Sequence, residues 1–189
     1  GSKNMISMSG AFGPEGIDLY KLNFISNVNK LRLANSVHIQ RNQDQEFSIP
    51  STVLNFNKGG LALSGTYSLA NGLNLESQFE LISLKQVLQF IRVDQTFSGL
   101  ATGTAQLTGA LFDPVIQVKM NLKEGVTLGY PSDSARIDLT MTSSKIISNE
   151  IEAFTKNGSL VLNGELPWGY TIKVIDVGAM ATHEDYIDA

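Results

Sequence analysis

Alternation of apolar and polar residues runs through most of the chain and restricts it to β-structure. In one clear run every second residue is apolar: Ile116, Val118, Met120 and Leu122. A period of two places successive side chains on opposite faces of a strand, so such a run is typical of a half-buried strand. About a dozen runs of this kind occur, which predicts an all-β fold with far more strand than the roughly 20–25% of an average domain.

Short turn signals separate these runs. Asn-Gly pairs occur at Asn71-Gly72 and Asn157-Gly158, and glycine also follows Lys58 and Glu124. Asn-Gly favours type I′ turns, which connect adjacent antiparallel strands. The sequence therefore predicts a meander of antiparallel hairpins.

One segment, residues 83–92, departs from the period of two. Its apolar residues have the spacing of one helix face: Leu84, Val87, Leu88 and Ile91. Ser83 and Gln86 have the spacing of a capping box at its start. We expect a short amphipathic helix that covers an open end of the β core. The alternative is an anchor for a partner or a membrane surface.

The chain also contains two internal sequence matches. Residues 56–65 and 154–164 share a phenylalanine, a lysine and glycines around two leucines, at an offset of about 98 residues, and residues 8–14 resemble residues 107–114. We interpret this as two units, residues 1–98 with the helix at 83–92, and residues 99–189. Repetition suggests a sheet that extends along one axis. Gly65 and Gly164, which end matching strands, are predicted to mark bends or bulges.

Residues needed for catalysis or metal binding are scarce. Cysteine is absent, which excludes disulfides, cysteine-ligated zinc and cysteine nucleophiles. The two histidines are His38, expected on the solvated side of a strand, and His183, in an acidic tail. No nucleophile elbow or phosphate-binding loop occurs, so we expect no enzyme, metal or cofactor. The net charge of −4 without a basic cluster argues against a nucleic-acid partner.

The apolar faces of the strands need a cover. A sheet buries such a face on helices, on another sheet or by curling. Only one short helix is predicted, so we expect a curved antiparallel sheet folded as a hydrophobic trough. Fourteen residues are predicted to line it: Leu61, Leu63, Leu73, Leu75, Phe79, Ile116, Val118, Met120, Leu122, Ile137, Leu139, Met141, Leu160 and Leu162. The trough could hold acyl chains, or these residues could form a dry core.

Two segments resemble a known family. The pattern L-x-L-x-G-x-L-P at residues 160–167, and the glycine-rich run at 99–118 preceded by a short helix, resemble TamB and its AsmA-like relatives. The resemblance implies a β-taco, a long sheet folded lengthwise into a trough. It implies a periplasmic segment of a longer protein anchored in the inner membrane of a diderm bacterium. It also implies phospholipid as cargo, an Omp85-type outer-membrane barrel as partner of the parent chain, and no catalytic residues.

The functional hypothesis is therefore a β-trough that shields lipid acyl chains during transport to the outer membrane, or that supports outer-membrane protein assembly. Two alternatives remain open. One is a structural or adhesive β-solenoid segment with a dry core. The other is a chaperone for outer-membrane β-strands, in which an open sheet edge adds a client strand.

Overall fold

A computed structural model describes residues 5–26, 29–42, 44–90, 98–127 and 130–167. Within these residues the chain forms twelve strands and one helix. The strands of the first half are β1 (Met5–Gly13), β2 (Gly16–Ile25), β3 (Lys30–Leu33), β4 (Val37–Arg41), β5 (Phe47–Phe56), β6 (Gly59–Ser68) and β7 (Gly72–Ser83). After helix α1 (Leu84–Phe90) come β8 (Ser98–Ala110), β9 (Asp113–Thr127), β10 (Tyr130–Met141), β11 (Lys145–Thr155) and β12 (Gly158–Pro167).

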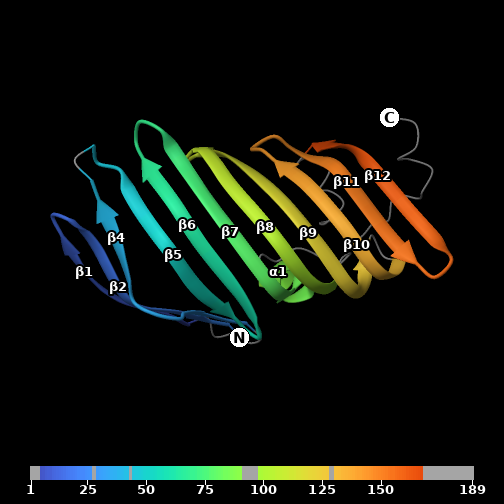
Figure 1. Cartoon of the computed structure of the whole chain (residues 1–189), viewed down its shortest axis with the longest axis horizontal. Helices are drawn as coiled ribbons and strands as arrows, with labels where there is room; N and C mark the ends of the chain where they lie inside the picture. Colours follow the sequence, from blue (N-terminus) through green and yellow to red (C-terminus); the bar gives the residue numbers. More distant parts are fainter. Residues whose placement is uncertain (1–4, 27–28, 43, 91–97, 128–129, 168–189) are drawn as a thin grey trace.

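All twelve strands belong to one antiparallel sheet, whose order follows the sequence. Strands β3 and β4 are the exception, because both lie between β2 and β5 and share the place of a single strand. Strands β1 and β12 form the opposite ends of the sheet (Figure 1). The all-β class and the meander predicted from the sequence are confirmed. The interpretation as two units stays a prediction.

Helix α1 follows β7 directly and begins one residue later than expected, because Ser83 is the last residue of β7. The side chain of Gln86 does not form the expected capping box with Ser83. Its side-chain oxygen accepts a hydrogen bond from Asn57 Nδ2 at 2.8 Å instead. The end of the predicted helix, residues 91 and 92, lies outside the described residues, as does the side chain of Leu88.

The Asn-Gly hairpins form, but the predicted type I′ turns are wrong. That turn requires positive φ at both central residues, and neither Asn71 nor Asn157 has it. The pair Ser68 and Gly72 instead encloses a three-residue loop. Gly72 takes the left-handed conformation with φ +73°, as expected for the glycine that closes such a loop.

β-Bulges bend the sheet at the two matched glycines. One extra residue is inserted in β5 between Ile49 and Thr52, and one in β11 between Ser148 and Ile151. Gly65 pairs with Ile49, and Gly164 pairs with Ser148. Each glycine thus lies opposite the start of a bulge on its partner strand, which confirms the predicted bulges. The predicted position at a strand end is wrong, because β6 continues past Gly65 to Ser68 and β12 continues past Gly164 to Pro167. Bulges increase local twist and bend the strand that carries them.

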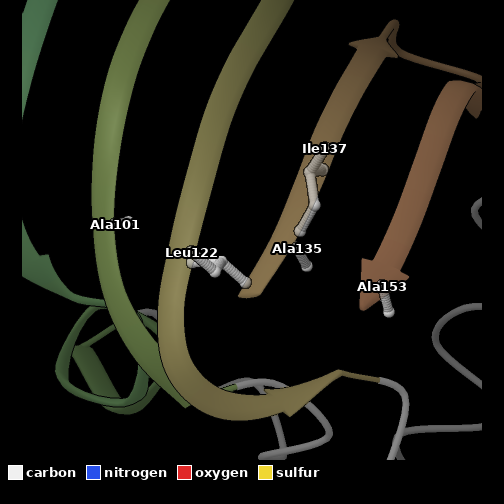
Figure 2. Packing of buried hydrophobic residues seen from close by; sticks show 5 residues of the cluster. All are labelled: Ala101, Leu122, Ala135, Ile137 and Ala153. Atoms are coloured by element: carbon white, nitrogen blue, oxygen red, sulfur yellow. The ribbon is translucent and has the colours of Figure 1, made fainter. Parts of the chain in front are cut away.

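The buried core lies on one face of the sheet. Its members come from β8 to β11 and are 1–6% exposed: Ala101, Leu122, Ala135, Ile137 and Ala153. Figure 2 shows β9 bending toward the side on which Leu122 projects. Leu84 of α1 packs against this cluster. The sheet therefore curves around its apolar face, and the helix covers part of that face.

Candidate functional site: the apolar face of the sheet

The strand register gathers the predicted trough residues into rows that cross the sheet. Residues directly opposite each other in an antiparallel pair project from the same face. The longest row contains five of the fourteen residues and runs through Leu33, Leu54, Leu61, Phe79, Gly103, Met120, Ile137, Ile151 and Leu162. This row spans nine strand positions, from β3 to β12.

Four parallel rows contain the other nine residues. Leu122 lies between Ala101 and Ala135, in a row that ends at Leu160. A second row joins Leu63, Ser77, Ala105, Val118 and Leu139; a third joins Leu75, Leu107, Ile116 and Met141; a fourth joins Tyr67 and Leu73. Because alternate residues of one strand share a face, all fourteen residues lie on the same face. We call it the apolar face.

Burial on the apolar face is uneven. Near α1, Leu122 is 2% exposed and Ile137 is 3% exposed. At the β12 end, Leu160 and Leu162 are exposed, because among the described strands β12 has a neighbour on one side only. At the β1 end, apolar side chains are still more open, with Met8 72% exposed. The ends of this face therefore offer uncovered apolar surface.

A polar cluster ties α1 to the sheet. Asn29 is 1% exposed and donates from Nδ2 to the backbone oxygen of Gln86 at 3.2 Å. Asn57 donates from Nδ2 to Asn29 Oδ1 at 3.1 Å, and its own Oδ1 accepts from the backbone N–H of Lys30 at 2.8 Å. Asn57 adopts φ +54°, a conformation that asparagine tolerates better than most residues. These bonds fix the start of the helix over the apolar face.

The opposite face is polar. Lys119 lies 3.2 Å from Asp138 on the neighbouring strand, and Asn149 donates to Asp138 Oδ1 at 2.9 Å. The hydrogen bond from Asn149 is the main cause of a lowered Asp138 pKa, and Lys119 adds to it. A hollow of about 380 Å³ also lies over this face, lined largely by polar residues such as Gln78 and Gln106. It is separate from the predicted acyl-chain surface.

Sequence reasoning missed several members of the apolar face. Ile49 and Ile151 belong to it, but each lies beside a bulge, which shifts the alternation by one residue. The apolar residues at the β1 end were also left out of the predicted trough. Ile17 pairs with Phe12 and with Ile39. The same period-two pattern would have found these residues.

The histidines and carboxylates do not form a metal site in the described part of the chain. His38 is half-exposed, and its Nδ1 lies 2.7 Å from Asp18 Oδ1 on the adjacent strand. This agrees with the predicted solvated position. His183 lies outside the described residues.

Among the described residues, no helix is long and apolar enough to cross a membrane. No family model, curated protein or solved structure matches the chain.

Proposed function

We propose that the apolar face binds lipid acyl chains, and that the protein shields them during phospholipid transport. The observation that carries this proposal is that the apolar face is much larger than the part of it that helix α1 covers. The face extends over the whole sheet, whereas α1 has seven residues and contributes Leu84 to the buried cluster. Large apolar side chains remain exposed at both ends of the sheet.

The energetics favour a ligand that is long and apolar. Each buried methylene contributes about 0.8 kcal/mol. A chain with about ten buried methylenes gains roughly 8 kcal/mol before the cost of ordering it. Such binding needs no polar contact, and a charged headgroup could stay in water beside the sheet.

The family resemblance extends the proposal to a cellular setting. It favours a periplasmic segment of a TamB/AsmA-like protein, with an Omp85-type barrel as partner of the parent chain. The proposed cargo is phospholipid moving toward the outer membrane, and a role in outer-membrane protein assembly is the related possibility. This setting rests on the sequence patterns at residues 99–118 and 160–167.

Neighbouring residues of β12 provide a matched test. Leu162 projects from the apolar face and is 38% exposed, whereas Val161 projects from the opposite face and is 52% exposed. A photo-crosslinking residue is placed at each position in turn, and the protein is irradiated in diderm bacterial cells. Lipid adducts are then identified by mass spectrometry of the purified protein.

We expect phospholipid adducts at Leu162 and few or none at the more exposed Val161. Equal labelling at the two positions would mean that lipid contacts the surface without regard to face. Absence of adducts at both Leu162 and Met120, which packs against the core, would support the dry-core alternative. Mass spectrometry of organic extracts from the unmodified protein gives a second, crosslinker-independent measurement.

A further inference from the structure

Two neighbouring hairpin turns expose large apolar side chains at one rim of the sheet. Leu69, in the loop between β6 and β7, is 88% exposed, and Phe112, in the turn between β8 and β9, is 94% exposed. Leu111 beside it is 49% exposed. Strands β6 to β9 all have a neighbouring strand on each side, so this exposure does not depend on the ends of the sheet. It follows from the protrusion of the two turns.

The two turns lie on the same rim because neighbouring strands alternate in direction. The turns after β1, β4, β6, β8 and β10 form this rim, and α1 lies at the opposite rim (Figure 1). Because β7 and β8 are neighbours, the two apolar turns are two strand spacings apart, which is about 10 Å. We call Leu69, Leu111 and Phe112 the apolar tips.

Neither turn geometry nor packing explains the apolar tips. Tight turns favour glycine, asparagine, aspartate and serine. Two turns of two residues on the opposite rim follow this preference in part and are polar: Asn57-Lys58 and Lys156-Asn157. The two-residue turn between β8 and β9 is instead Leu111-Phe112. A side chain as exposed as Phe112 buries little apolar area, and residues that break a local rule without a structural gain are expected at functional sites.

The charges near the apolar tips favour a partner without net charge. Segments 69–71 and 110–113 contain a single charged residue, Asp113. The neighbouring turn between β4 and β5 carries both signs, with Arg41, Asp44 and Glu46. Binding to a lipid surface depends on buried apolar area and on attraction between cations and anionic lipid. With this charge distribution, the apolar area is the main contribution.

The area of the apolar tips suits a bilayer better than a protein. Covering a phenylalanine completely buries about 150–250 Å², so three side chains fall short of the roughly 800 Å² that each partner buries in a standard protein interface. A bilayer needs no matching shape, and it accepts phenylalanine and leucine at the boundary between headgroups and acyl chains.

We infer that the apolar tips insert into the headgroup boundary of a zwitterionic lipid bilayer and dock the sheet on it by this rim. Helix α1, at the opposite rim, is then directed away from the membrane. The apolar tips are a different surface from the apolar face, so this docking is independent of the proposed binding of acyl chains.

Vesicles of phosphatidylcholine are the probe, and co-sedimentation of the whole protein with them measures the affinity. The double variant Leu69→Ser/Phe112→Ser removes two of the apolar tips. Val161→Ser is the control, because Val161 is 52% exposed and lies on the polar face of β12. Serine suits turns and the replaced tip side chains are almost fully exposed, so the double variant should fold, which a thermal melt checks. We expect at least tenfold weaker binding in the double variant and wild-type binding in Val161→Ser.

A second measurement locates the inserted rim. The chain has no cysteine, so a single introduced cysteine can be labelled with an environment-sensitive dye. Phe112→Cys places the dye at the apolar tips, and Lys58→Cys places it at the opposite rim. We expect vesicles to shift the dye emission to shorter wavelength in Phe112→Cys and to leave it unchanged in Lys58→Cys.

Four results would overturn the inference. The first is no sedimentation at millimolar lipid, which would leave a protein as the partner of the apolar tips. The second is wild-type affinity in the double variant, and the third is an equal dye shift at both rims. The fourth is a tenfold loss of affinity in Leu162→Ser, which would place the vesicle contact on the apolar face. Presence or absence of lipid adducts at Leu162 changes none of these outcomes.

Discussion

The two matched glycines should respond differently to the same substitution. Gly65 lies in β6, between β5 and β7, with φ +141°. A Cβ atom there would overlap the backbone oxygen of Asn74 and lie 2.8 Å from the Cα of Leu75. Gly164 lies in β12 at the end of the sheet, and a Cβ atom there would meet no atom within 4 Å.

The structure sets the size of the difference. Placing an L-residue at a left-handed φ costs about 1–3 kcal/mol. Overpacking against neighbouring backbone costs about another 1–3 kcal/mol. Gly65→Ala should therefore lower the free energy of unfolding by about 2–6 kcal/mol. Gly164→Ala should leave it unchanged or raise it by up to about 1 kcal/mol, because alanine reduces the entropy of the unfolded chain.

Urea unfolding followed by far-UV circular dichroism measures both effects. With a slope of about 2 kcal/mol per M of urea, Gly65→Ala should move the midpoint down by roughly 1–3 M. Gly60→Ala is the control in the same strand as Gly65, because its added Cβ would also meet no atom within 4 Å. Equal midpoints for Gly65→Ala and Gly60→Ala would refute the argument from close approach and backbone conformation. An equal loss of unfolding free energy in Gly65→Ala and Gly164→Ala would refute the distinction between an inner strand and an end strand.

Three further predictions concern α1 and the polar face. Leu84→Asp should lower the free energy of unfolding by about 2–5 kcal/mol, because Leu84 packs against the core; an unchanged thermal midpoint would show that the helix does not cover the face. Asn57→Gly keeps a residue suited to φ +54° but removes its side-chain bonds. It should lower the free energy of unfolding by about 1–3 kcal/mol and speed amide exchange in α1. Unchanged exchange in α1 would contradict the role of these hydrogen bonds in holding the helix on the sheet. Asp138→Asn should destabilise at pH 7 by about 1 kcal/mol or less. The lowered Asp138 pKa means that its contribution is present above the ordinary value of 3.8 and is lost as the pH falls below it. Chemical unfolding should therefore show a larger difference from wild type at pH 7 than at pH 2.5, and a difference that is equally large at pH 2.5 would contradict this origin.

Local pattern alone determined the strands and the face on which most apolar residues lie. The run Ile116–Leu122 alternates without interruption, and its four apolar residues occupy four neighbouring rows of one face. A strand's alternation depends only on backbone geometry, so nearby residues are sufficient to predict it. The same holds for the helix at α1, because its spacing of three and four differs from the period of its neighbours.

Contacts between strands decided the rest. The bulge in β11 inserts one residue between Ser148 and Ile151, so these two residues share a face although they lie three positions apart. Ile151 thereby enters the row of Ile137, where uninterrupted alternation from Ile146 would have placed Glu150. Pairing also decided exposure. Leu63 and Leu162 both follow the pattern L-x-L, but Leu63 lies between two strands, whereas Leu162 lies at the end of the sheet and is 38% exposed. A second neighbouring strand is a nonlocal contact, and the sequence around either leucine does not encode it.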